Sequence, residues 1–118
     1  KMRRVLETQL KKDLSGVSKV AFKNGVIAYE PVWAIGTGLS ATPEHARKAL
    51  SVIQKTLKRL WKTKNVPTRI LYGGSVNAKN SGQFVSKKGG GMDGMLVGGA
   101  SLNAKEFIGI LKAASRTK

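Results

Sequence analysis

The chain has 118 residues, enough for one modest domain with a core, and we expect a single domain over residues 1–118 with a frayed tail at 115–118. It has no cysteine and one histidine, which excludes disulfides and cysteine-ligated metals, so we predict no metal and no cofactor. The 22 Lys+Arg against 6 Asp+Glu give a net charge of +16. A charge of this size indicates nucleic acid or anionic surfaces as partners; the alternative is that the basic side chains are simply solvated. No apolar run approaches the ~20 residues of a membrane span and no signal-peptide core begins the chain, so we expect a soluble protein of the cytoplasm or an organelle.

Helical and strand-like segments alternate along the first half of the chain. Residues 2–14 carry apolar side chains at helical spacing, and the short apolar run 26–29 follows an Asn-Gly turn signal and is expected to be a strand. The clearest helix covers residues 43–62, because Thr42 can cap it and Pro43 suits its first position.

The second half continues the same alternation. Residues 70–72 and 95–97 are expected strands, separated by a weaker helical segment at 78–88 that a run of three glycines ends. Asn103 is expected to cap a last helix. Strands alternating with helices predict an α/β fold with a parallel sheet, either an open layer or one arc of a (β/α)8 barrel.

The helix over 43–62 has a basic face opposite its apolar stripe. This face is either simply solvated or contacts nucleic-acid phosphates through four side chains: Lys48, Lys55, Arg59 and Lys62.

A single carboxylate, Glu30, ends the strand at 26–29, and the Gly-rich segment 34–38 follows it. Abstraction of a proton next to a carbonyl requires a carboxylate that is fixed and partly desolvated, and the apolar strand and Pro31 can provide this. Gly36 and Gly38 allow the backbone to swing and its N–H groups to approach an anion. Two further glycine motifs, Gly73-Gly74-Ser75 and Gly98-Gly99, each follow an expected strand.

The segments 28–38 (Ala-Tyr-Glu-Pro-Val-Trp-Ala-Ile-Gly-Thr-Gly), 72–75 and 97–101 closely resemble triosephosphate isomerase, in family order. The resemblance covers roughly residues 3 to 114 and about the last half of the family's domain. It implies a partial TIM (β/α)8 barrel of about three parallel strands, the sixth to eighth of the family, with flanking helices.

The resemblance also implies roles for individual residues. Glu30 would be the catalytic base. The substrate phosphate would be bound by Gly36, Ser75, Gly98 and Gly99. The lid would be formed and latched by Pro31, Val32, Trp33, Ala34, Ile35, Thr37, Gly38 and Tyr72. Pro31-Val32-Trp33 would be the first hinge of this lid. Leu39-Ser40-Ala41 would be the second hinge, and it departs from the commonest family pattern, Lys-Thr-Ala.

The family's first-strand lysine and asparagine and its fourth-strand histidine have no counterpart in these residues. His45 lies in the first turn of the 43–62 helix, where we expect a surface histidine.

Three functions remain open. The first is the C-terminal part of a triosephosphate isomerase, which interconverts dihydroxyacetone phosphate and glyceraldehyde 3-phosphate, a glycolytic reaction; it would be inactive alone and would need another chain or segment to cover its open sheet edges. The second is a non-catalytic structural or RNA-binding subunit of a ribonucleoprotein such as an organellar ribosome. The third is an assembly subunit that caps another protein without contacting RNA.

Overall fold

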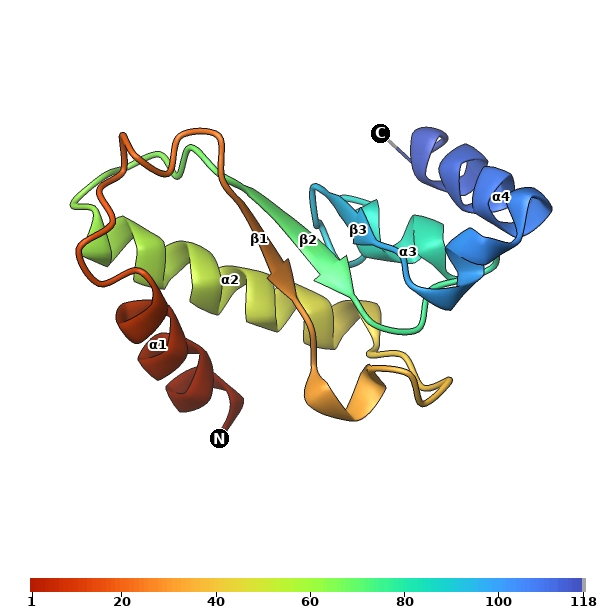
Figure 1. The fold of residues 1–118 in the computed structure, drawn as a ribbon, viewed down its shortest axis with the longest axis horizontal. Helices are drawn as coiled ribbons and strands as arrows, with labels where there is room; N and C mark the ends of the chain where they lie inside the picture. The colour runs from red at the N-terminus through yellow and green to blue at the C-terminus, as the bar shows by residue number, and fades with distance from the viewer. Residues whose placement is uncertain (118) are drawn as a thin grey trace.

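Three parallel strands form one open sheet within residues 1–117, the part of the chain that the computed structural model describes (Figure 1). The strands lie in the order β1 (Val26–Tyr29), β2 (Arg69–Gly73) and β3 (Gly94–Leu96). The register places Tyr29 opposite Tyr72, and Tyr72 opposite Met95. The predicted α/β fold with three parallel strands is therefore confirmed. β1 has the predicted ends, and those of β2 and β3 differ from the predicted ones by one residue.

Four α-helices accompany the sheet, as the alternation of segments predicted: α1 (Met2–Asp13), α2 (Pro43–Leu60), α3 (Ser81–Val85) and α4 (Ala104–Ser115). Two short 3₁₀ helices, η1 (Val32–Ala34) and η2 (Gly99–Leu102), follow β1 and β3. The Thr42 hydroxyl accepts the His45 N–H at 3.1 Å, and the Asn103 Oδ1 accepts the Glu106 N–H at 2.9 Å, so both predicted N-caps form.

The helix predicted at 78–88 is shorter in the structure. It ends at Val85 because the chain folds back after Ser86, and the Gly90 N–H donates to the Gln83 carbonyl at 2.8 Å. A Cβ at Gly89 would lie 2.1 Å from that same oxygen, so this return requires glycine. The frayed tail predicted at 115–118 stays a prediction: Ser115 ends α4, and Lys118 lies outside the described residues.

One face of the sheet carries the hydrophobic core. The side chains of Tyr29, Ile70 and Tyr72 point to this face and are buried with residues of α2, which runs along the strands in Figure 1. On the opposite face, Val26 and Leu96 each remain 49% exposed. Parallel sheets are normally covered on both faces. Within residues 1–117, by contrast, one apolar face and both edges of this sheet are uncovered.

Tyr72 is the centre of the core. Its ring stacks on Phe84 with 3.9 Å between ring centroids, and its buried hydroxyl accepts the Ala41 N–H at 2.8 Å. Burial raises the pKa of the Tyr72 hydroxyl, and the hydrogen bond from Ala41 offsets only part of that rise. Burial also raises the pKa of Tyr29, with a smaller contribution from neighbouring Tyr72.

Shortening a fully buried side chain of α2 should lower the stability of the fold far more than shortening a partly exposed one. Leu57→Ala removes a fully buried side chain and should lower the free energy of unfolding by about 2–5 kcal/mol. Leu60→Ala, at a position 36% exposed on the same helix, should cost less than about 1.5 kcal/mol. Urea denaturation followed by circular dichroism measures both, and equal losses would contradict this description of the core.

Loss of the Tyr72 hydroxyl should destabilise the fold at neutral pH and reduce its sensitivity to alkali. Tyr72→Phe leaves the buried Ala41 N–H without its acceptor, which costs about 1–3 kcal/mol. Because the folded-state pKa of Tyr72 is raised, the unfolded chain loses its proton first, and stability falls as pH rises above about 10. The urea midpoint should fall less between pH 8 and pH 11 in Tyr72→Phe than in the unaltered chain. An equal fall in both proteins would contradict the role of this hydroxyl.

Candidate functional site

A cavity of about 570 Å³ lies where the loops after β1, β2 and β3 meet. The carboxyl ends of parallel strands share one edge of a sheet, so loops far apart in sequence converge there. Seven of the predicted site residues line this cavity: Glu30, Ile35, Gly36, Gly38, Ser75, Gly98 and Gly99. Gly74 and Val76 also line it. Tyr72 lies in the core below the loops, and Pro31, Val32 and Trp33 line a different groove between β1 and α1.

Glu30 is held at this edge by its position one residue beyond β1. Its exposed carboxylate has no hydrogen-bond or ion-pair partner among residues 1–117. Across the strand pair stands Gly73, where an added Cβ would lie 2.5 Å from the Glu30 Cγ. Gly73 therefore provides the space in which the Glu30 side chain lies, a role that the sequence reasoning missed because it took this glycine only as part of an anion-binding loop.

The segment over residues 31–39, which the resemblance predicts to be a lid, is held by local hydrogen bonds near both of its ends. The Ala34 N–H donates to the Pro31 carbonyl at 2.8 Å, which closes η1. The Thr37 hydroxyl donates to the Trp33 carbonyl at 3.0 Å and accepts the Leu39 N–H at 3.1 Å. Gly36 and Gly38 have φ values of +64° and +75°, which side-chain-bearing residues rarely adopt. The tip is thus a tight, glycine-dependent turn that stands in solvent.

Two hydrogen bonds join this segment to the β2 end. The Tyr72 hydroxyl accepts the Ala41 N–H at 2.8 Å, and the Ser75 hydroxyl donates to the Ala34 carbonyl at 3.3 Å. The resemblance assigned Tyr72 to latching the lid and Ser75 to binding the substrate phosphate; in the structure, both hydroxyls bond to this segment.

The third loop presents open backbone to the cavity. Gly98 and Gly99 are exposed, and a Cβ at either position would meet no atom within 4 Å. The Ser101 hydroxyl donates to the Gly98 carbonyl at 2.7 Å and fixes the turn. The space beside these two glycines is therefore accessible to a ligand.

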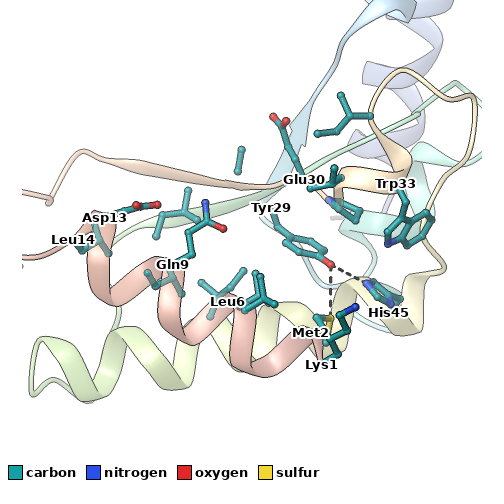
Figure 2. A pocket seen from close by; sticks show the side chains of 18 residues that line it. Lys1, Met2, Leu6, Gln9, Asp13, Leu14, Tyr29, Glu30, Trp33 and His45 are labelled. Carbon is teal, nitrogen blue, oxygen red and sulfur yellow. Dashed lines mark hydrogen bonds between the residues drawn. The ribbon is translucent and has the colours of Figure 1, made fainter.

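His45 is not the surface histidine that its place in the helix suggested. It is half-buried, its Nε2 lies 2.8 Å from the Tyr29 hydroxyl, and its ring meets the edge of Trp33 at 5.7 Å between centroids (Figure 2). The tertiary fold explains this burial, because β1 runs past the first turn of α2 and brings Tyr29 beside His45. No signal in the sequence pairs these residues. His45 lines the groove between β1 and α1 and does not line the 570 Å³ cavity.

The basic face of α2 is exposed, as its spacing indicated. Lys48, Lys55 and Lys62 are solvent-exposed, with Lys62 just beyond the helix end. Arg59 instead forms an ion pair with Glu7 of α1 at 2.8 Å, and Glu7 also pairs with Arg3 at 3.0 Å. The two guanidinium groups lower the pKa of Glu7.

Neither a metal cluster nor a membrane-spanning helix is found in the described part of the chain. Across residues 1–117, no three His, Asp or Glu side chains gather where they could hold a metal ion. None of the helices there is both long and apolar enough to cross a membrane.

Comparisons with known proteins agree with this arrangement of loops. The sequence model of the family described as triosephosphate isomerase matches residues 1–114. The chain is 46% identical over 111 residues to the triosephosphate isomerase of Dehalococcoides mccartyi, covering 93% of the chain and 42% of that relative. It is 45% identical to the Entamoeba histolytica enzyme over 94% of the chain and 42% of the relative, and 50% identical to the Candida albicans enzyme over 86% and 41%. The chain thus spans about two fifths of the length of these relatives, and it belongs to the triosephosphate isomerase family.

Proposed function

We propose that this chain supplies the base, the lid and the phosphate-binding loops of a triosephosphate isomerase. The observation that carries this proposal is the cavity in which Glu30 and the glycine-bearing loops of all three strand ends meet. The substrates would be dihydroxyacetone phosphate and glyceraldehyde 3-phosphate, the pair on which family members act.

The chemistry follows from the residues of the cavity. The Glu30 carboxylate would take a proton from C1 of dihydroxyacetone phosphate, and the electron pair would form an enediolate. The same carboxyl group would return the proton to C2 while the hydroxyl proton on O1 moves to O2, which gives glyceraldehyde 3-phosphate without net oxidation. The absence of a protein partner for the carboxylate leaves it available for this transfer.

The phosphate group would be held by backbone amides. Gly36, Ser75 and Gly99, with Gly98 beside them, line one cavity and belong to three loops. Amides without side-chain cover can approach a dianion closely, and the net charge of +16 draws anions toward the molecule. The lid over residues 31–38 would close on the bound phosphate and exclude water from the enediolate.

The electrophile that stabilises the enediolate would come from outside these residues, because His45 does not line the cavity of the phosphate-binding loops; its own groove shares only Glu30 and Ile35 with that cavity. We propose that a further polypeptide completes the barrel along β1. A groove of about 820 Å³ lies between β1 and α1, and apolar side chains such as Leu6, Leu10 and Ile27 line it. An added strand would pair with the open edge of β1 and cover this groove.

The test is reconstitution with the complementary N-terminal portion of the Entamoeba histolytica relative, co-expressed with this chain. The soluble complex should interconvert the two triose phosphates in a coupled dehydrogenase assay. Glu30→Gln should lower kcat by about 10²–10⁴-fold, the usual contribution of a general base.

Glu44→Gln is the matched control, because Glu44 is an exposed acid in the first turn of α2 and does not line the cavity. It should leave kcat unchanged. A soluble complex without turnover, or turnover that survives Glu30→Gln, would refute the proposed isomerase function.

The exposed lysines of α2 favour a second candidate, RNA binding by a non-catalytic subunit. Lys48 and Lys55 lie on one side of α2, and Lys62 follows the helix end. Within residues 1–117, none of the three forms the ion pairs that engage Arg59. Such a stripe would bind phosphates through counterion release, so affinity would fall steeply with salt. The alternative in which the chain only caps another protein requires no such binding.

A salt titration distinguishes RNA contact at this face from a diffuse effect of charge. For binding to poly(U) measured by fluorescence anisotropy, replacing Lys48, Lys55 and Lys62 by Gln should reduce the slope of log K against log salt by about 2. The control replaces three exposed lysines elsewhere, Lys79, Lys105 and Lys112, at equal net charge. Equal slopes for the two triple variants, or no binding by the unaltered chain, would exclude an RNA-binding face on α2.

A further inference from the structure

His45 joins three parts of the molecule that the lid would need to coordinate. It lies in the first turn of α2, shortly after the second hinge, its imidazole Nε2 lies 2.8 Å from the hydroxyl of Tyr29, and its ring packs on Trp33 in an edge-to-face arrangement. Tyr29 immediately precedes Glu30, and Trp33 belongs to the first hinge. Figure 2 shows the imidazole between the tyrosine hydroxyl and the indole. One side chain therefore contacts both the strand that carries Glu30 and the start of the lid.

The hydrogen bond between Tyr29 and His45 can run in either direction. The Tyr29 side chain is 7% exposed, and its hydroxyl has a second neighbour, the Met2 sulfur, at 3.7 Å. A neutral imidazole nitrogen is a stronger acceptor than a thioether sulfur, so the hydroxyl donates to Nε2 when that nitrogen carries no proton. When His45 is protonated, Nε2 becomes a donor to the tyrosine oxygen, and the hydroxyl hydrogen must turn toward Met2.

Protonation also places a positive charge beside Trp33. The two ring centroids are 5.7 Å apart in an edge-to-face arrangement, so a charge on the imidazole changes the electrostatic field at the indole. The Trp33 side chain is 49% exposed, so the contact with His45 supports its otherwise half-solvated ring. Both partners of His45 thus experience a change when the imidazole gains a proton.

We propose that His45 is a positioning residue for the first hinge of the lid, and that its protonation state sets how Trp33 and Tyr29 are held. The role in the lid rests on the proposed isomerase function, whereas the contact with Trp33 exists in this chain without substrate. His45 does not touch the reacting atoms in this arrangement; it acts through Trp33 and Tyr29.

Other charged groups line the groove of His45 or adjoin it on α2. Lys1 and Glu30 line the groove, with Asp13 farther along α1; on α2 itself, Glu44 precedes His45 and Lys48 follows one turn later. Carboxyl and lysine side chains ordinarily titrate outside the interval between pH 5.5 and 8. Variants at position 45 assign a response in this interval to the imidazole.

The experiment is ¹⁹F NMR of the 118-residue chain labelled with 5-fluorotryptophan, which gives one signal for Trp33 and one for Trp61. Trp61 serves as an internal control, because its indole N–H donates to the Val17 carbonyl at 3.0 Å and its ring packs on Phe22. Trp33→Phe assigns the signals. Between pH 8 and 5.5, the interval in which histidine titrates, the Trp33 signal should shift and the Trp61 signal should stay in place.

Two substitutions separate the titration from the contact. His45→Gln keeps a hydrogen-bonding group beside Tyr29 but cannot titrate, so the Trp33 signal should stay narrow and lose its pH dependence. His45→Ala removes both the hydrogen-bonding group and the titrating ring, so the Trp33 signal should shift toward that of an exposed indole at every pH. An unchanged Trp61 signal shows that the variant is folded. A Trp33 pH response that persists in His45→Gln, or a Trp33 signal unaffected by His45→Ala, would overturn the proposal.

Inorganic phosphate distinguishes this inference from the proposed function. Amide shifts of Gly36 and Gly99 on phosphate addition report the anion site, and the Trp33 response reports the hinge. Phosphate shifts without a His45-dependent Trp33 response would refute the positioning role alone. A His45-dependent Trp33 response without phosphate shifts would support the contact and count against the isomerase function.

Discussion

Parallel pairing of β1, β2 and β3 in one register is the constraint on which the rest of the structure depends. It aligns Tyr29 with Tyr72 and Tyr72 with Met95, so the residues that follow each strand reach the same edge of the sheet. Glu30 lies beside Gly73 for this reason, although 43 positions separate the two in the chain, as they separate the paired residues Val26 and Arg69. A shift of one residue in β2 would point its inward side chains outward and would replace Gly73 beside Glu30.

The same register divides the site into buried and exposed parts. Tyr72 is buried and stacked on Phe84, and it anchors the segment at Ala41 from below. Ser75 contacts the other end of this segment, at Ala34. Between these two anchors, residues 35–40 are exposed. A loop held firmly at both ends and solvated in the middle has the construction that a closing lid requires, because the ends define the path and the middle is free to move.

Local signals in the sequence were sufficient for much of the fold and for part of the site. Thr42 and Asn103 act within one helical turn, so the N-caps they form could be predicted from neighbouring residues alone. The end of α3 depends on the return of the backbone at Gly89 and Gly90, a packing effect that periodicity does not contain. The contact between His45 and Tyr29 requires the path of β1 past α2, and the space at Gly73 requires the strand register. These features became visible only once the elements were placed together.

The uncovered face of the sheet has a consequence for the behaviour of the chain in solution. Open strand edges beside exposed Val26 and Leu96 favour pairing between copies, whereas a net charge of +16 makes the copies repel one another. The range of this repulsion is set by the ionic atmosphere and shrinks from about 10 Å at 0.1 M salt to about 3 Å at 1 M. In dilute buffer, long-range repulsion therefore keeps the molecules apart in solution. Concentrated salt screens this repulsion, so the unpaired strand edges of neighbouring molecules can meet and associate.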